Sequence, residues 1–498
     1  MYEGNKRLAW LLATTRLLGP QTRGLSRAEF VAPMKELGVR IDSSRISRWE
    51  SGLEYISPQL VEAYEKVAGL RPAQIGAVRR TLARDGHLIT RPAERAGATS
   101  DPGVIDELLD GLESQRIRGD QWIRLSDQLR SYQSVYLQRR IWQDLTDHLV
   151  DELARTASIP YLARYEAAAA LMNAPQAQPY LTKSVGRYVL DPETRVITPV
   201  LQVLTEIADP AASDLVLRLM TAPSAKLRSS AAIAASAMIR RGNLAPDHKV
   251  LEVHVGHELV RGGRPSVVVL DLASRLTDDQ FERVLRSATD DVTRTTLRQA
   301  RSNWELVDSE QARIFSDHIG LHAELLCARN SADPDQMLSR LVREALFHVH
   351  RSRRHLASSL ILASPYATAV GEVVLRLTNH ADDRLASLCW SMVARMTAVI
   401  SATALAERLD EEARPELRTR AAAALMWVGG DLPDAAVRTL VSTVEDHETA
   451  PDAARAAILA LGLADRRDEL NQLLVKCPDD LRRLIQWACE RGPAVAED

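Results

Sequence analysis

An internal repeat constrains the fold of this 498-residue chain more than any other feature of its sequence. Three segments near the C-terminus place an arginine before a run of small apolar residues, and these arginines, Arg384, Arg418 and Arg455, are 34 and 37 residues apart. A similar pattern occurs at residues 223–239, and a weaker copy at 160–172. Repetition at such a period predicts a stack of similar units, each of which buries its apolar face only against its neighbours.

Each unit is expected to pair two helices. An outer apolar helix, such as residues 197–209, precedes an inner helix in which arginine is followed by alanines. Alanine lets neighbouring helices approach closely, so stacked pairs can share one core. The pattern resembles the HEAT-type α-solenoid over residues 160–490, although other helical-pair repeats fit it too and the stretch 245–355 follows the period poorly. Such stacking is expected to give a long concave groove rather than a closed pocket.

A different pattern occupies residues 26–70. Ser26 can cap a helix that carries Phe30 and Met34, and Gly38 permits a left-handed helix end. Asp42 or Ser43 then caps a second helix, which ends at Gly52. This is the layout of a helix-turn-helix, with Trp49 in its core and Glu50 in a structural role.

The segment Ile46–Gly52, followed by Pro58 and a helix that ends at 68–70, resembles the Cro/CI-type (XRE) family of bacterial DNA-binding domains. The turn at 38–43 and the connection at 19–25 are longer than usual in that family. The resemblance implies that base edges are read by a set of serines and arginines: Ser43, Ser44, Arg45, Ser47 and Arg48. It implies phosphate contacts from a second set: Lys6, Arg7, Arg23, Arg27, Ser51 and Tyr55. The alternative is a helical bundle that only docks on the repeat, with its arginines solvated.

We therefore predict an all-α chain with a small N-terminal helix-turn-helix domain followed by a HEAT-like α-solenoid. The expected parts are the DNA-binding domain at 1–89, a linker at 90–103, an amphipathic helical connector at 104–154 and the helical-repeat domain at 155–498. Residues 1–90 hold 14 Lys+Arg and 9 Asp+Glu, whereas the remainder holds 49 and 57, so only the N-terminal part has a net positive charge. A basic head on an acidic body favours contact between the head and a polyanion.

Enzymatic and metal chemistry are not supported by the sequence. The four cysteines lack CxxC spacing, and no catalytic constellation stands out, so we expect neither enzymatic activity nor a cofactor. His318 and His322 are four apart, but two histidines without a third ligand do not indicate a zinc site. The basic run at 348–355 is interpreted mainly as a solvated helix face that could instead touch DNA or an acidic partner. No signal peptide or membrane span is expected, which predicts a cytoplasmic, nucleoid-associated protein.

The function predicted from these features is sequence-specific regulation of bacterial transcription. The head would bind double-stranded DNA as part of a homodimer, and the linker would let it reposition when the body binds a signal, a peptide or a protein partner. The alternative is a DNA-localised scaffold or interaction protein. A HEAT-like DNA glycosylase is a further option, against which the acidic, aromatic-poor body argues.

Overall fold

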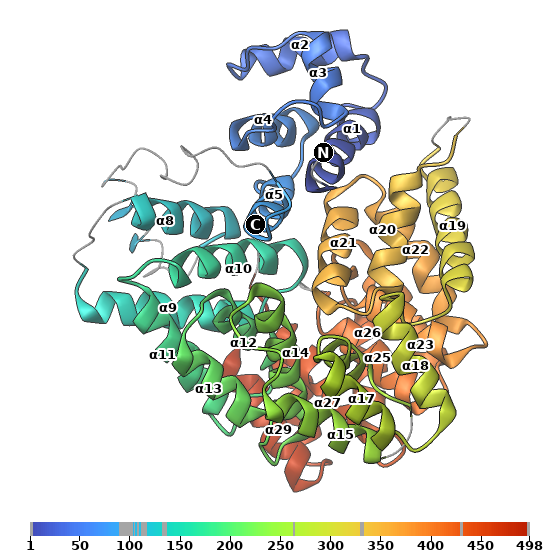
Figure 1. The fold of residues 1–498 in the computed structure, drawn as a ribbon. Helices are drawn as coiled ribbons and strands as arrows, with labels where there is room; N and C mark the ends of the chain where they lie inside the picture. The colour runs from blue at the N-terminus through green and yellow to red at the C-terminus, as the bar shows by residue number, and fades with distance from the viewer. Residues whose placement is uncertain are drawn as a thin grey trace.

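The computed structural model consists of helices joined by short turns (Figure 1). It describes residues 3–88, 103, 105–106, 109–110, 117–131, 137–261, 264–328, 333–428 and 432–495. Within these ranges there is no strand, and the one isolated β-bridge joins Glu305 to His348. The predicted all-α class is therefore confirmed.

Five helices form the N-terminal head: α1 (Glu3–Leu18), α2 (Arg27–Glu36), α3 (Ser43–Glu50), α4 (Pro58–Ala68) and α5 (Gln74–Arg84). Apolar side chains of the first four helices meet in one core, in which the rings of Phe30 and Tyr64 lie 4.9 Å apart. Ile46 and Trp49 of α3 are buried in the same core. The amphipathic pattern of residues 26–70 thus folds as the sequence predicts.

The body is an array of helices. Its first half contains α8 (Gly119–Ser131), α9 (Arg139–Ala154), α10 (Ser158–Met172), α11 (Gln178–Leu190), α12 (Thr198–Leu201), the 3₁₀ helix η1 (Gln202–Glu206), α13 (Pro210–Leu219), α14 (Ala225–Arg241), α15 (Lys249–Val260), α16 (Val267–Ala273), α17 (Asp278–Ser287) and α18 (Asp291–Ser302). Its second half contains α19 (Ser309–Leu326), α20 (Gln336–Phe347), α21 (Arg351–Ala363), α22 (Ala367–Arg376), η2 (Leu377–Asn379), α23 (Asp383–Val393), η3 (Thr397–Val399), α24 (Ala402–Glu411), α25 (Pro415–Leu425), α26 (Asp434–Glu445), α27 (Pro451–Leu463), α28 (Arg467–Leu474) and α29 (Asp479–Arg491).

These helices stack in two layers, as a solenoid of helical pairs requires. Near the C-terminus α23, α25, α27 and α29 pack side by side, while α24, α26 and α28 form the second layer. Small residues set the spacing, since Ala422 and Ala457 are fully buried. A Cβ on Gly462 of α27 would lie only 2.8 Å from the Cβ of Ala488 in α29. The arginine-then-alanine helices are thus the closely packed inner helices that the repeat predicts, and the array is a HEAT-like α-solenoid.

The two ends of the array lie against each other. The chain after α29 returns to α9, where the guanidinium of Arg155 donates to the carbonyl of Pro493 (2.9 Å) and the Val495 amide donates to the carbonyl of Arg155 (3.2 Å). Arg491 also lies 3.4 Å from Asp191, just after α11. The last helical unit therefore contacts the first, a contact that the expected long concave groove does not include.

Two irregular regions of the sequence are also helical. The stretch 245–355 follows the repeat poorly, yet it continues the array through α15–α21. Within it, the apolar run at 266–273 forms α16. The described helices of the expected connector, α8 and α9, pack on α10 and α11. The predicted linker lies outside the described residues, apart from residue 103.

Candidate nucleic-acid interface

The α2–α3 unit is built by local signals that can be followed residue by residue. Ser26 and Glu29 form a reciprocal capping box at the start of α2. Gly38 has φ +78°, the left-handed conformation that ends a helix at low cost. Asp42 caps α3 by accepting a hydrogen bond from the Arg45 amide at 2.8 Å, and Gly52 follows the helix with φ +71°. These predicted caps and helix ends are confirmed.

Glu50 holds the unit together from inside, as the sequence suggests. Its carboxylate accepts hydrogen bonds from Arg16 of α1 at 2.6 and 2.9 Å, and from Arg27 of α2 at 3.3 Å. Because Arg16 and Glu50 are almost fully buried, this pair fixes α3 relative to α1 and α2. Trp49, which is 4% exposed, belongs to the core.

The five residues expected to read bases lie on or beside the solvent face of α3. Ser43 and Ser44 are exposed, and Ser47 is half-buried. Arg45 and Arg48 both form an ion pair with the carboxylate of Glu54. The Nε of Arg45 lies 2.9 Å from that carboxylate, and the Nε of Arg48 lies 3.3 Å from it.

Glu54 is therefore a common counter-charge for the two arginines of α3, although only Arg45 donates a hydrogen bond to it. Arg45 also donates to the carbonyl of Arg40 at 2.9 Å and covers the ring of Trp49 at 5.2 Å. Exposed ion pairs of this kind contribute little stability, so a guanine edge or a phosphate can replace Glu54 at low cost.

The residues expected to contact phosphate fall into two groups. Lys6, Arg27 and Ser51 are exposed. The other three are engaged: Arg23 donates to the carbonyl of Cys327 (2.7 Å), Tyr55 is half-buried near Arg79, and Arg7 is buried against Glu344 (2.6 Å). Arg7 cannot reach a phosphate from this position, which corrects the prediction for that residue.

One surface residue near α3 was missed. Arg40 lies exposed in the turn between α2 and α3, and its carbonyl already contacts Arg45. The available signal was a cation in the loop that leads into the reading helix. Figure 1 places α2 and α3 at the end of the head farthest from the body, so no helix of the body covers this face.

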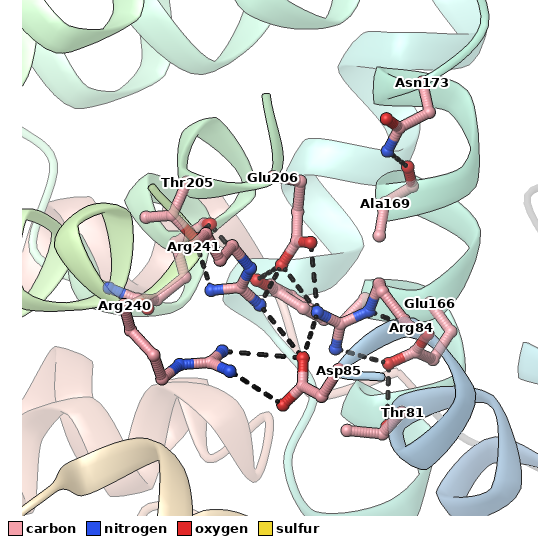
Figure 2. A network of polar contacts seen from close by, with 12 residues as sticks. Thr81, Arg84, Asp85, Glu166, Ala169, Asn173, Thr205, Glu206, Arg240 and Arg241 are labelled. Atoms are coloured by element: carbon pink, nitrogen blue, oxygen red, sulfur yellow. Dashed lines mark hydrogen bonds and ion pairs between the residues drawn. The ribbon is translucent and has the colours of Figure 1, made fainter. Parts of the chain in front are cut away.

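The opposite side of the head is docked on the body through α5. Arg84 lies 2.8 Å from Glu166 of α10 and 3.0 Å from Glu206 of η1, and Asp85 lies 3.1 Å from Arg240 of α14 (Figure 2). Burial works against the charge of Arg84, but the two glutamates hold its pKa well above the usual value. Asp85 likewise has a pKa below its usual range, because the surrounding arginines outweigh its burial.

A second set of contacts joins α1 to the other half of the body. The indole Nε1 of Trp10 donates to Asp335 at 3.0 Å, and its ring stacks on Tyr366 at 6.3 Å between centroids. Arg7 meets Glu344 of α20 in the same region. The head is thus clamped between the two halves of the array, which differs from the freely repositioning head expected from the linker.

The two histidine-containing motifs of the body lie in different surroundings. His318 and His322 lie on α19 with ring centroids 4.1 Å apart, and the described residues contain no group of three or more His, Cys, Asp or Glu side chains placed to hold a metal. The basic run at 348–355 is not a solvated face, because Arg354 is buried and Arg351 and His355 line a cavity.

Comparisons with known proteins leave the family open. No family model matches the chain, and no curated protein matches it. Among solved structures, yeast importin-beta (Kap95p) aligns over 95% of this chain and 70% of its own, with 13% sequence identity and a TM-score of 0.25. So low a TM-score carries no weight, and the fold assignment is based on the helical pairs described above. No helix in the described ranges is both long enough and apolar enough to span a membrane.

Proposed function

We propose that this protein is a sequence-specific DNA-binding regulator of transcription, with α3 as its reading helix. The observation that carries the proposal is the exposed α3, whose Arg45 and Arg48 lie on the part of the head that the body leaves uncovered. Arginine can bond guanine O6 and N7 together, and the polar start of α3 suits entry into the major groove. The resemblance of Ile46–Gly52 to the XRE family supports the same function.

The phosphate contacts in this proposal come from the exposed Lys6, Arg27 and Ser51, to which we add Arg40. Arg27 lies near the start of α2, where the helix dipole also favours an anion. A single small head binds one half-site weakly, so we propose a homodimer that spans two half-sites about one DNA turn apart.

The test has two steps. The full-length protein is first used to select the genomic DNA fragments that it binds, and its affinity for the selected site is then measured by gel shift. Arg48→Ala should lower specific affinity by about 1–3 kcal/mol while nonspecific binding persists, since only a base contact is lost. Arg376→Ala is the matched control, because Arg376 is a 65% exposed arginine on α22 of the body. No selected sequence, or equal binding by Arg48→Ala and wild type, would contradict the proposal.

A phosphate contact should behave differently in the same gel shifts. Lys6→Ala should weaken specific and nonspecific DNA alike and reduce the slope of log K against log salt by about 1. Light scattering of the protein on the selected duplex tests the dimer, for which we expect two chains per site.

A second candidate is a DNA-localised scaffold, and one observation favours it. Ile314, Leu321 and Leu325 recur at helical spacing along α19 and are 56%, 49% and 67% exposed. An apolar stripe on a surface helix is typical of a protein contact. A reporter fused to the selected site would separate the candidates: Leu321→Asp with Leu325→Asp should leave a self-sufficient regulator active but silence a scaffold that acts through its partner.

A further inference from the structure

A cavity of about 430 Å³, open to solvent on part of its surface, lies in the body, where its two halves face each other. Its walls come from the inner helices α10, α14 and α16 of the first half and from α21, α23 and α25 of the second, while the end of α5 supplies part of the wall from the head. The volume falls in the range of small-molecule sites. Nothing in the DNA-binding proposal uses this space.

Three arginines of the second half line the cavity without a carboxylate partner. Arg395 donates to Ser358 Oγ at 2.9 Å and to the carbonyl of Ala345 at 2.7 Å. Arg420 donates to Ser391 Oγ at 3.1 Å, and the guanidinium of Arg351 has no hydrogen-bond acceptor in the described chain. None of the three forms an ion pair with a carboxylate in the described ranges, although Asp271 attracts Arg351 and Glu416 attracts Arg420 at longer range.

Burial makes these charges costly. Burial lowers the pKa of Arg351 despite attraction from Tyr161 and Asp271, and it lowers the pKa of Arg395, where repulsion from Arg354 and Arg351 adds to the effect. Arg420 lies at the exposed edge of the cavity. A buried cation without a counter-charge is stabilised when an anion enters its site.

The carboxylates that also line the cavity are already engaged. Asp85 pairs with Arg240, as described above. Asp271 lies 3.1 Å from Arg275 and 3.0 Å from His350, and it accepts the backbone amide of Arg351 at 2.9 Å. Neither carboxylate accepts a hydrogen bond from the guanidinium groups of the three arginines.

Two neutral polar groups on the same wall also lack a hydrogen-bond partner among the described residues. Trp390 lines the cavity and is 1% exposed, yet its indole Nε1 has no acceptor within the described part of the chain. The hydroxyl of Ser352, beside Arg351, is likewise unsatisfied. Buried donors normally have partners, so the gap is informative.

We propose that this cavity binds a phosphorylated small molecule, with its phosphate oxygens held by Arg351, Arg395 and Arg420. Arg351 and Arg395 lie close enough to repel each other, and Arg420 adds a third cation at the edge of the cavity, so a ligand with more than one negative charge is favoured. The planar guanidinium fork matches phosphate oxygens. Trp427, which also lines the cavity, offers a ring face for a planar group such as a nucleobase.

Isothermal titration of the full chain at low ionic strength tests this with pyrophosphate, ATP and citrate as probes. Pyrophosphate and ATP should bind, and Arg351→Gln or Arg420→Gln should weaken each by about tenfold or more. Arg376→Gln, an exposed arginine outside the cavity, should leave both affinities unchanged. ATP binding that is tighter than pyrophosphate and is reduced by Trp427→Ala would indicate a nucleotide; equal binding would indicate recognition of the phosphates alone.

Other outcomes overturn the proposal. These are the absence of phosphate binding at millimolar concentration, affinities that Arg351→Gln leaves unchanged, or citrate binding as tight as that of pyrophosphate. Tighter, Arg351-dependent binding of a single-stranded oligonucleotide would assign the cavity to nucleic acid instead. Thermal melts guard against misfolding: Arg351→Gln should melt at or above the wild-type temperature, and pyrophosphate should raise the melting temperature of wild type more than that of the variant.

Discussion

The reading face of the head and the wall of the cavity both present arginines, but the two regions treat the charge in opposite ways. On α3, Arg45 and Arg48 are 41% and 55% exposed and share the carboxylate of Glu54. In the cavity, Arg395 lies close to Arg351 and Arg354, and neither Arg351 nor Arg395 forms an ion pair with a described carboxylate. Exposed pairs exchange partners at little cost, whereas a buried unpaired cation favours a bound anion.

This difference teaches that the number of arginines says little about what they bind. On the head surface, Arg45 and Arg48 can separate from Glu54 and bind a DNA base or phosphate instead. The arginines of the cavity have no described carboxylate paired with them that a ligand would have to displace. A bound anion would itself supply their counter-charge. The junction network around Arg84 lies between these extremes, because it is buried and fully paired.

The largest difference in stability is expected between two substitutions, one that removes a paired arginine and one that removes an arginine outside any ion pair. Arg84→Met leaves Glu166 and Glu206 without this cation, and should lower the free energy of unfolding by about 3–5 kcal/mol. Arg351→Met removes a cation that forms no ion pair in the described ranges and is attracted by Asp271 only at longer range, so it should leave stability nearly unchanged or higher. Urea denaturation of both variants measures this, and similar losses in the two would break the distinction.

A pH effect is expected from burial within the head itself. Burial raises the pKa of Glu65 to about 7, although the amides of Ala73, Ile75 and Gly76 donate to its carboxylate and oppose that shift. The folded head then holds a proton that the unfolded chain releases above about pH 4.5. The stability from this proton is complete below that pH and is lost as the pH rises through 7, by about 3 kcal/mol in all.

Urea midpoints measured from pH 4.5 to 7.5 test this effect. Wild type should lose stability with rising pH over that window, whereas Glu65→Gln, which cannot ionise, should show a flatter profile. Parallel profiles for the two proteins would show that Glu65 is not the group responsible.

Packing of the inner helices should give a smaller effect. Ala422 is fully buried in α25, so Ala422→Leu adds bulk at a close helix crossing and should cost about 1–3 kcal/mol. Ala413 is exposed before α25, so Ala413→Leu should cost little. Thermal melts compare the two variants, and the reverse order would mean that the register of the inner helices is wrong.

The smallest predicted change sharpens the role of Glu54. Glu54→Gln removes the shared counter-charge of Arg45 and Arg48, so specific DNA affinity should rise by roughly threefold, in keeping with the small energy of an exposed pair. Gel shifts on the selected site measure the rise. Glu62→Gln, an exposed glutamate on α4 paired with Lys66, is the matched control and should change affinity less.

Local signals were enough to predict much of the head. The capping residues Ser26 and Asp42, the left-handed Gly38 and the buried Trp49 each act through their immediate neighbours, so their roles could be predicted from spacing. The repeat likewise predicted the stacked helical pairs, since alanine at helical spacing favours close packing wherever it occurs. Whether α3 binds DNA remains a prediction.

The sequence by itself determined the helices, their caps and the closely packed alanine faces, because these depend on residues a few positions apart. Only the tertiary structure decided the long-range charge pairing: that Arg7 meets Glu344, that Arg84 meets Glu206, and that the guanidinium of Arg351 forms no ion pair with a described carboxylate. The same structure brought the last helices of the array against the first, a contact that the repeat alone did not predict. The physical reason is that these contacts join residues up to several hundred positions apart. No local pattern encodes the ion pairs or the contact between the last and the first helices of the array.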